Sequence, residues 1–453
     1  MTVAERRRRQ RNRRPLHPTQ VVFAGFAGVA ILGTALLLLP FAKAGPGAAA
    51  WNEALFTAVS ALCVTGLVVV DTPTYWTPFG EAVILALIQV GGFGVMTFAS
   101  FVGLVIARRL SYRGRINAAT EAHAMGLADV RQLIMNVVAI SVLIESIVAV
   151  VLAVHGMAAY GMGFGEAVWF GVFHGISAFN NAGFALFSDS MIQFVGDPVV
   201  NLTLSCAIIL GGLGFPVIMQ LRRHVARPRL WTMNTRLVLL MTLALLLVGT
   251  VLITALEWSN PDTLGALRWD QRILAGFFQS VQTRTAGFNS VDIGAMDDST
   301  LLGMIVLMFI GGGPAGTAGG IKITTFGVLL FILLAEVRGD GVVNVLGKRL
   351  SRAVHRQAIA VVLLSVALVV GATMLLQILT DNRLADVLFE SVSAFATVGL
   401  STGITASLPP SAQVVLVVLM FVGRLGPITF ATALALRPRS VAYQFPKERP
   451  IIG

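Results

Sequence analysis

Charged side chains are scarce in this sequence. Asp, Glu, Lys and Arg make up 12% of its 453 residues, whereas 56% are hydrophobic and the mean hydropathy is +0.82. A soluble domain carries about 25% charged residues. Because half of that charge cannot cover a surface that faces water, the composition excludes an ordinary soluble protein and predicts an integral membrane protein.

Cysteine, histidine and recognisable catalytic motifs are also lacking. Two cysteines, Cys63 and Cys206, allow no disulfide framework and have no metal-ligand spacing. The six histidines are scattered, no nucleophile stands beside a base, and no GxxxxGK[ST] phosphate-binding motif occurs. We therefore expect no enzyme activity, no ATP hydrolysis by this chain and no resident cofactor.

Long apolar segments take the place of these missing features. A helix needs about 20 apolar residues to cross the hydrocarbon core of a bilayer. The first segment follows an Arg-rich stretch, but it is longer than the core of a cleavable signal peptide, which has roughly 7–15 residues. We expect eight spanning helices in all. The clearest apolar blocks are Val21–Pro40, Ala82–Ala107, Val137–Val154, Leu237–Leu256, Ala358–Leu379 and Val414–Leu436.

Basic residues gather in clusters that alternate with acidic or neutral connections. Lys and Arg mark the cytoplasmic side of a membrane protein, so every second connection and both termini are predicted to be cytoplasmic. The basic tail is interpreted as a topology signal with some attraction to anionic lipid rather than as a nucleic-acid site. The clusters lie at residues 6–14, 108–115, 222–229, 348–356 and 437–449.

Four glycines mark four copies of one unit. A phenylalanine lies ten residues before each glycine, a serine lies six or seven residues before it, and Leu or Phe follows it directly. A second glycine cluster occurs further along in each copy. Chance does not supply four such matches, each framed by apolar helices. The three sets are Gly66, Gly183, Gly287 and Gly399; Phe56, Phe173, Phe277 and Phe389; and Ser60, Ser177, Ser280 and Ser393.

Each copy has the pattern of a long helix, a short amphipathic helix, a glycine turn and a second long helix. The short segments cannot cross a bilayer, so they are predicted to be re-entrant helices that enter from the extracellular side. They are Trp51–Leu62, Gly165–Phe179, Arg272–Gln282 and Leu384–Phe395.

The predicted fold is an all-α membrane protein with four tandem helix–re-entrant pore helix–filter loop–helix repeats around a pseudo-four-fold axis. Repeats of the same orientation place that axis along the membrane normal, whereas an inverted-repeat carrier would flip alternate copies. The predicted segments are a cytoplasmic tail at 1–19, pore repeats at 20–109, 130–223, 235–337 and 357–437, and a cytoplasmic tail at 438–453.

The glycine turns are candidate selectivity-filter loops. Carbonyl oxygens that point at a common axis replace the hydration shell of an ion, and glycine permits the backbone angles that this requires. No loop carries a carboxylate, which favours a monovalent over a divalent cation. The alternative is that the glycines serve only helix packing or capping. The loops are Cys63, Val64, Thr65 and Gly66; Asn180, Asn181, Ala182 and Gly183; Arg284, Thr285, Ala286 and Gly287; and Ala396, Thr397, Val398 and Gly399.

Arg284 is a cation inside a predicted cation filter. We expect its side chain to point away from the axis and to tie the loop to a neighbouring carboxylate or to helix-end carbonyls, while its own carbonyl points inward.

A glycine-rich break in the last helix of the third copy is the candidate gate. Six glycines and a proline in ten residues cannot hold a regular helix, and such a break at membrane depth lines a cavity or is covered by protein. The alternative is a passive kink. Lys322, just after it, is expected to pair with a carboxylate or to reach the cytoplasmic interface. The break comprises Gly311, Gly312, Gly313, Pro314, Ala315, Gly316, Thr317, Ala318, Gly319 and Gly320.

Arg424 is the second gate candidate. It follows Ser411 by 13 residues in the last apolar segment, which is about 20 Å along a helix. A charge at membrane depth is costly and is a functional candidate by default. We expect Arg424 to raise the barrier to cations and to hold the gate loop closed. The alternative is a structural ion pair with Glu145.

The motifs together resemble the Trk/Ktr/HKT superfamily of potassium transporters. They are FNNAGF at 179–184, TAGFN at 285–289, GGPAGTAGGIK at 312–322 and ATVGLS at 396–401. The likeness covers about residues 20–436 and is greatest to the membrane-subunit (KtrB) branch. The family uses the broken segment as a gate and carries an arginine at the position of Arg424.

The resemblance implies a function and partners. It implies potassium uptake across the bacterial cell membrane, a homodimer of pores, and a cytoplasmic nucleotide-binding regulatory ring of the KtrA type. K⁺ is the expected transported ion, with Na⁺ as an activator or coupled ion. The family associates serine in the first loop with sodium preference, so Gly66 favours potassium. A sodium-permeable or sodium-coupled transporter is the alternative.

Overall fold

Helices make up most of the part of the chain that the computed structural model describes, residues 18–109 and 127–426. Within that part, the strands are β1 (Asn344–Val345) and β2 (Lys348–Arg349), which pair as a small antiparallel hairpin. The remaining residues include most of the predicted N-terminal tail, the whole C-terminal tail and the end of the fourth repeat. Predictions for those segments therefore lie outside the described residues.

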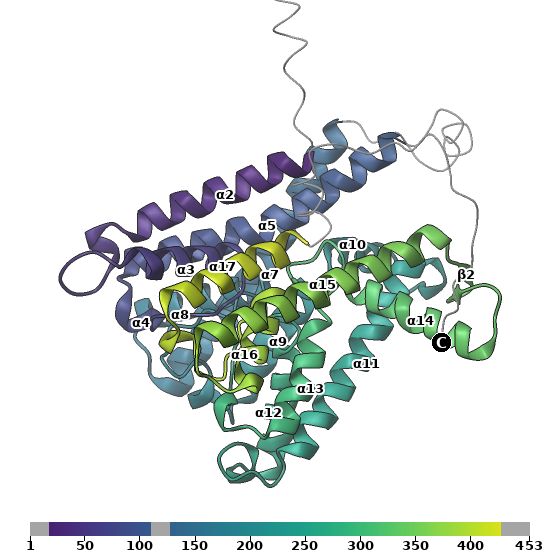
Figure 1. Ribbon diagram of the computed structural model, residues 1–453. Helices are drawn as coiled ribbons and strands as arrows, with labels where there is room; N and C mark the ends of the chain where they lie inside the picture. Colours follow the sequence, from purple (N-terminus) through teal and green to yellow (C-terminus); the bar gives the residue numbers. More distant parts are fainter. Residues whose placement is uncertain (1–17, 110–126, 427–453) are drawn as a thin grey trace, which may run out of the picture.

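The helices follow one another in four similar sets (Figure 1). The first set is α2 (Pro18–Leu37), α3 (Trp51–Leu62) and α5 (Pro78–Arg109), with the single turn α4 (Thr72–Tyr75). The second is α7 (Leu127–Tyr160), α8 (Phe164–Phe179), α9 (Pro198–Leu213) and α10 (Phe215–His224). The third is α11 (Met233–Leu256), α12 (Trp269–Gln282), α13 (Asp298–Phe309) and α14 (Ile323–Arg338). The fourth is α15 (Arg352–Leu379), α16 (Leu384–Ala396) and α17 (Pro410–Leu425).

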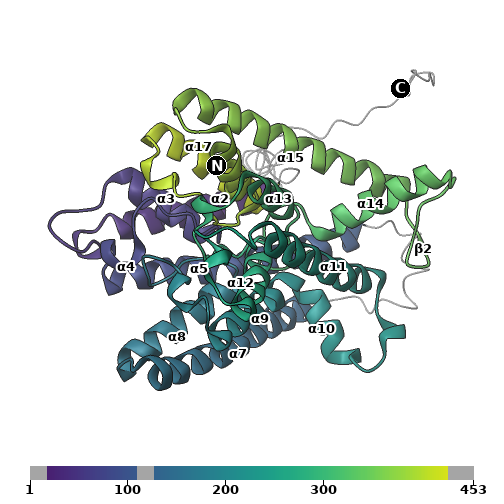
Figure 2. The same cartoon turned by 90° about the horizontal axis from the view of Figure 1, so that it is seen from below.

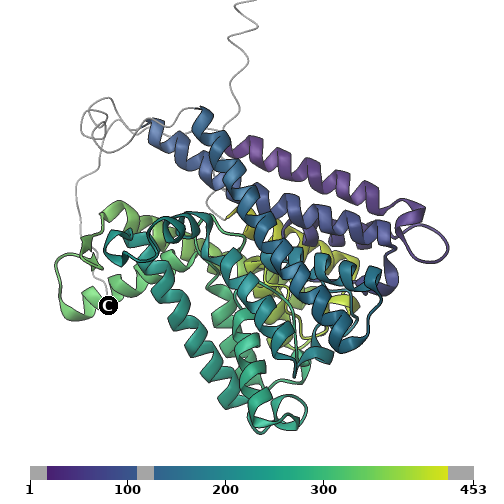
Figure 3. The ribbon, with the colours of Figure 1, turned by 180° about the vertical axis from the view of Figure 1, so that it is seen from behind.

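The four short helices predicted from the sequence are confirmed. The observed helices α3, α8, α12 and α16 begin and end within about three residues of the predicted bounds, which is the usual uncertainty of helix ends. The sets follow one another around the molecule, as Figure 2 shows from below and Figure 3 from behind. Contacts between α17 and α3 bring the last set back beside the first.

The long helices meet the expectation of eight spans only in part. By length and composition, three described helices could cross a membrane, namely Ile134–Tyr160 of α7, α11 and α15, and the bent pair of α9 and α10 would make a fourth. The other expected spans contain shorter apolar helices at Val22–Leu37, Pro78–Gly94, Asp298–Phe309 and Pro410–Leu425.

A bend in the second set departs from the expectation that this copy ends in one continuous long helix. The chain bends by 100° between α9 and α10, at Gly214, which has φ +90°. Helix α17 ends at Leu425, followed by Gly426 with φ +84°. A methyl group on Gly214 would lie closer than 3.0 Å to the Pro314 carbonyl oxygen. The bend therefore lets the chain pass close to residues 311–320 of the third set. This tertiary contact could not be predicted from the local sequence.

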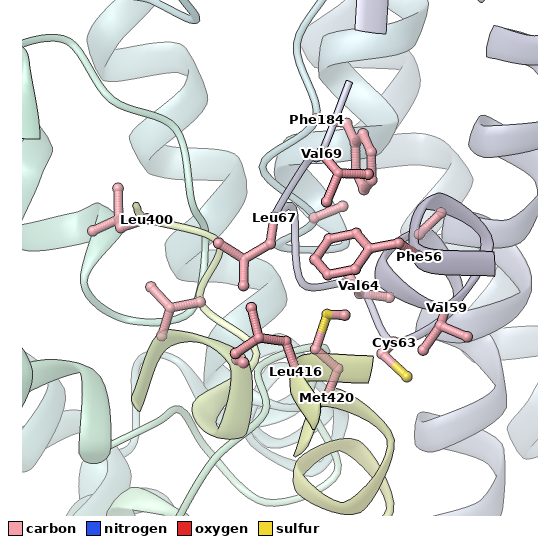
Figure 4. Close-up of a cluster of buried hydrophobic side chains, with 14 of the residues drawn as sticks. Phe56, Val59, Cys63, Val64, Leu67, Val69, Phe184, Leu400, Leu416 and Met420 are labelled. Carbon is pink, nitrogen blue, oxygen red and sulfur yellow. The ribbon is translucent and has the colours of Figure 1, made fainter. Parts of the chain in front are cut away.

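Buried side chains of the first and fourth sets form one part of the core (Figure 4). Phe56 of α3 and Leu67 lie in one hydrophobic cluster with Leu416 and Met420 of α17. The four residues that directly follow the repeat glycines are all buried, with at most 1% of their surface exposed: Leu67, Phe184, Phe288 and Leu400. This burial anchors the glycine turns against the helices around them.

Candidate ion-conduction site

The four candidate filter loops share one backbone shape. In each loop the second residue and the fourth, the glycine, have positive φ. Non-glycine residues seldom adopt this region, and holding one there costs about 1–3 kcal/mol. The same unusual shape in all four loops supports the alignment of the repeats. The angles are 55° and 94° at Val64 and Gly66, 59° and 70° at Asn181 and Gly183, 66° and 83° at Thr285 and Gly287, and 52° and 95° at Thr397 and Gly399.

The four repeat glycines meet in a closed ring of backbone contacts. A methyl group on any of them would lie closer than 3.0 Å to the carbonyl oxygen of the third residue in the next loop. A side chain at these positions is therefore blocked by backbone atoms as well as disfavoured by φ. The contacting pairs, in order around the ring, are Gly66 with Ala182, Gly183 with Ala286, Gly287 with Val398, and Gly399 with Thr65.

Serine side chains of the short helices hold three of the loops. The Ser60 hydroxyl donates to the Leu67 carbonyl at 2.7 Å and accepts from the Gly66 amide at 3.2 Å. Ser177 donates to the Phe184 carbonyl at 2.8 Å, and Ser393 accepts from the Gly399 amide at 3.1 Å. The sequence marked these serines only as part of the repeat. Their constant spacing of six residues from the glycine was the signal of this role.

The third loop is held differently. Helix α12 ends five residues before Gly287, whereas α3 ends four residues before Gly66. The Gln282 side chain holds the loop in place of the serine, since it accepts a hydrogen bond from the Phe288 amide at 3.1 Å. The Ser280 hydroxyl instead donates to the Leu246 carbonyl of α11 at 2.9 Å. The extra residue also shifts the helix face. Phe278 is fully buried, rather than Phe277, which aligns with the repeat phenylalanines of the other sets.

Arg284 reaches away from the ring, but not to the partners expected. Its guanidinium donates to the carbonyl and the hydroxyl of Thr242 at 3.2 and 3.4 Å. Thr242 lies within α11 rather than at a helix end, and the ion pairs recorded among the described residues do not include Arg284. The expected carboxylate or helix-end partner is therefore wrong. A tertiary contact in mid-helix holds the side chain instead.

The candidate gate loop between α13 and α14 is tied down by its backbone. The Gly311 amide donates to the Ile321 carbonyl at 2.9 Å, which joins the two ends of the break. The amides of Gly313 and Thr317 donate to the carbonyls of Gly212 and Gly211 in α9, at 2.7 and 3.2 Å. Carbonyls at the end of α9 that lack helix partners thus receive hydrogen bonds from the loop.

The same loop contacts the second and fourth filter loops directly. The Thr317 hydroxyl donates to the Asn181 side-chain oxygen at 2.8 Å. A methyl group on Gly319 would lie closer than 3.0 Å to the Thr397 hydroxyl oxygen. The candidate gate is therefore packed against the candidate filter. Lys322 also turns back to this loop, since its ammonium donates to the Ala318 carbonyl at 2.7 Å.

Arg424 joins the loop to two helices. It is 5% exposed, and its guanidinium donates to the Thr317 carbonyl of the loop and, at 3.1 Å, to the Gly91 carbonyl of α5. The alternative ion pair with Glu145 is wrong, because Glu145 instead accepts from the amides of Gln89 and Asn180. The expected contact between Arg424 and the loop is present.

The second glycine cluster brings the later helices onto the short helices. In three sets, a methyl group on the glycine would lie closer than 3.0 Å to the last carbonyl oxygen before the filter loop. The third set departs from this, because Gly311 faces Gly319 across the break. The three pairs are Gly91 with Leu62, Gly211 with Phe179, and Gly423 with Phe395.

Comparisons with known proteins match nearly the whole chain. The family model of TrkH, described as cation transport protein, matches residues 6–443. The Ktr system potassium uptake protein B of Bacillus subtilis (strain 168) is 38% identical over 423 residues, 93% of this chain and 94% of that protein. The protein of the same name from Vibrio alginolyticus is 39% identical over 436 residues, 96% of this chain and 94% of that protein.

Two further proteins extend the comparison. The potassium/sodium uptake protein NtpJ of Enterococcus hirae is 32% identical over the full length of both chains. The crystal structure of the potassium transporter TrkH from Vibrio parahaemolyticus superposes with a TM-score of 0.74 at 18% identity, covering 94% of this chain and 86% of that one. At this identity the superposition shows the fold alone. The family model and the relatives above 30% identity show that this chain belongs to the TrkH family of cation transport proteins.

Proposed function

We propose that this chain takes up potassium across the bacterial cell membrane through a pore with a backbone-carbonyl selectivity filter. The observation that carries the proposal is the closed ring in which each repeat glycine contacts the next loop. Carbonyls gathered in this way replace the hydration shell of an ion without a fixed negative charge. The names of the relatives from Bacillus subtilis and Vibrio alginolyticus, potassium uptake proteins, support the same substrate.

Cation preference follows from charge around the ring. The four short helices end at the filter loops, and a helix C-terminus carries roughly half a negative charge. The loops contain no carboxylate, so a monovalent ion is bound weakly enough to leave again. Arg284 does not oppose this, since its guanidinium is directed to Thr242.

The loop at residues 311–320 acts as the gate in this proposal. It packs against two filter loops and is held by Arg424. In the closed state the loop occupies the path next to the filter, and the positive charge of Arg424 raises the barrier for cations. Opening requires the loop to leave its contacts with Asn181 and Arg424.

A sodium-permeable or sodium-coupled transporter is the second candidate. It is favoured by the relative from Enterococcus hirae, which is named a potassium/sodium uptake protein. Glycine at position 66, where the family associates serine with sodium preference, favours potassium. Na⁺ would then act as an activator rather than as the main transported ion.

Assembly with other chains is part of the proposal. We propose a homodimer whose cytoplasmic face binds a nucleotide-binding regulatory ring of the KtrA type, with both termini in the cytoplasm. The "Ktr system" in the names of two relatives supports a multi-component system. The basic connection at residues 222–229 and the acidic connection at 292–298 support this orientation.

Flux into liposomes tests the proposed function. Purified protein is reconstituted, and uptake of K⁺, Rb⁺ and Na⁺ is measured with and without a KtrA-type subunit. We expect K⁺ and Rb⁺ flux to exceed Na⁺ flux and to rise with the subunit. Equal Na⁺ flux would favour the second candidate, and a slow flux that saturates at low ion concentration would indicate a coupled carrier instead of a pore.

A further inference from the structure

Three polar side chains form a buried triangle behind the second filter loop. The Gln89 side-chain amide of α5 donates to both carboxyl oxygens of Glu145 at 3.1 Å. The Asn180 side-chain amide donates to Glu145 at 3.1 Å and to the Gln89 side-chain oxygen at 3.0 Å. Asn180 is the first residue of the second loop, so the triangle links this loop to α5 and α7.

Close packing of three helices places this triangle. A methyl group on Gly175 of α8 would lie 3.0 Å from the Glu145 carbonyl oxygen of α7. Gly92 of α5 similarly leaves room for the Asn180 side-chain oxygen. Small residues let helices in a membrane approach this closely. The carboxyl group of Glu145 therefore has little freedom to turn away from Asn180.

Glu145 is an unusual residue for such a place. It is 6% exposed in the middle of α7, and a carboxyl group at membrane depth is costly. Its recorded hydrogen-bond partners are the neutral amides of Gln89 and Asn180, and the ion pairs recorded among the described residues do not include it. Packing alone does not require a polar side chain here, whereas holding the Asn180 amide requires an acceptor oxygen.

The first residue of the third filter loop is also bonded to a long helix through its side chain. This residue, Arg284, is bonded to Thr242 of α11. The first residues of the other two loops, Cys63 and Ala396, have side chains that cannot donate several hydrogen bonds. In the second and third loops, the side chain of the first residue is thus bonded to a long helix, Asn180 to α7 and Arg284 to α11.

We propose that Glu145 is a positioning residue for ion selectivity, which acts by holding Asn180 and, through it, the second filter loop. The inference rests on the proposed potassium pore. Selectivity depends on the placement of carbonyl oxygens around the ion. Removing the acceptor leaves the Asn180 amide with fewer partners, and the loop gains freedom to contract around a smaller ion such as Na⁺.

Two substitutions separate hydrogen bonding from charge. Glu145→Gln keeps an acceptor oxygen for Asn180 but removes the ionisable group, whereas Glu145→Leu removes both. Because Glu145→Leu leaves the Asn180 amide without this buried acceptor, we expect it to lower the K⁺/Na⁺ flux ratio about tenfold. Glu145→Gln should stay within about twofold of the wild-type ratio.

Glu81→Leu is the matched control. Glu81 lies on α5 and is also buried, with 8% of its surface exposed. Its carboxyl group accepts a hydrogen bond from the Trp169 indole N–H at 2.7 Å. Trp169 lies 11 residues before Asn180, or roughly 16 Å along α8. Loss of this carboxyl group should leave the flux ratio unchanged even where it lowers stability.

The flux ratio is measured in liposomes at equal amounts of monodisperse protein. A wild-type ratio in Glu145→Leu, or an equal loss in Glu145→Gln, would overturn the inference. Should Glu145→Leu fail to fold, Asn180→Ala cuts the same contact from the loop, and an unchanged ratio there would overturn it as well. Absence of K⁺ flux in the wild-type protein would instead count against the proposed function.

Discussion

At the scale of single residues, the candidate filter depends on backbone angles that side chains disfavour. Two positions in each loop have positive φ, and only one of the two is glycine. Val64, Asn181, Thr285 and Thr397 remain there because neighbouring helices and loops surround them, and each is at most 1% exposed. Strain of this kind persists only where the structure around it over-determines the conformation. The packing around the candidate filter loops therefore holds these four residues in a conformation that they disfavour.

Arg424→Ala is expected to raise potassium flux. The substitution removes the bonds to the Thr317 and Gly91 carbonyls together with a positive charge beside the proposed path. Loss of a charged hydrogen bond, about 1.5–3 kcal/mol, should increase basal flux by an order of magnitude or more. The measurement is Rb⁺ uptake into liposomes without a regulatory subunit.

Arg424→Lys is the control for this prediction. Lysine keeps the charge but lacks the planar fork of arginine donors, so an intermediate flux is expected. Unchanged transport by Arg424→Ala at normal expression would contradict the proposed barrier.

At the scale of elements, the broken helix is the part of the chain that couples the candidate gate to its surroundings. Residues 311–320 contact the bend after α9, two filter loops and α17. A displacement of any of these elements would therefore alter the contacts that hold the loop. Its glycines allow close approach, while specific hydrogen bonds give it a defined position.

Thr317→Val is expected to loosen the loop while keeping its shape. Valine has nearly the volume of threonine but cannot donate to the Asn181 oxygen. One neutral hydrogen bond contributes about 1 kcal/mol, so basal Rb⁺ flux should rise about fivefold. Thr324→Val, on α14 outside the loop, is the control and should leave flux unchanged. Equal flux in wild type and Thr317→Val would argue against a latch between gate and filter.

Asp197 at the start of α9 predicts a pH dependence of stability. Its carboxylate caps the helix by accepting from the Val199 and Val200 amides at 2.8 and 3.2 Å. Burial opposes ionisation, but hydrogen bonds from His155, Tyr160 and these amides outweigh it and hold the pKa of Asp197 below its ordinary value. Because the pKa is lower in the folded state, this stabilisation is complete above about pH 4 and is lost as pH falls further.

Thermal unfolding in detergent between pH 7 and pH 3 measures this effect. Asn is also a good N-cap, so Asp197→Asn should keep the helix start while flattening the fall in Tm below pH 4. Asp189→Asn, an exposed aspartate in the same connection, serves as the control. A fall as steep in Asp197→Asn as in wild type would show that other groups carry the acid sensitivity.

At the scale of the whole molecule, four sets of helices close around one ring. Each set alone would leave the ring open, because the carbonyl that contacts each glycine belongs to the next loop. The outer faces of the long helices remain apolar and exposed, for example at Leu143, Val251 and Leu363. Such faces suit lipid rather than water, so the ring lies at the centre of a membrane-embedded assembly.

Cysteine labelling tests the predicted orientation of this assembly. Single cysteines are placed at Arg227, in a basic connection, and at Asp262, between α11 and α12, in a Cys206→Ala background because Cys206 is exposed. A membrane-impermeant maleimide should label Asp262→Cys in intact cells and Arg227→Cys only in inverted vesicles. The opposite pattern would contradict a cytoplasmic location of the basic connections.

The sequence by itself determined the membrane class, the four repeat units and the bounds of the short helices. Apolar length, glycine spacing and periodicity are local properties, so they could be predicted without the tertiary structure. The role of the loop residues as a selectivity filter stays a prediction. The contact between Arg424 and the loop at residues 311–320 was predicted correctly. The partners of Arg284, the bend at Gly214 and the burial of Phe278 rather than Phe277 were not.

Only the tertiary structure decided which groups meet. Thr242, Asn181 and Gln89 lie 42, 136 and 91 residues from the partners Arg284, Thr317 and Asn180 with which they bond. No local pattern encodes such pairings, because they depend on how helices from different repeats pack around the ring. Sequence spacing therefore indicates where the filter and gate residues lie, and helix packing determines what holds them in place.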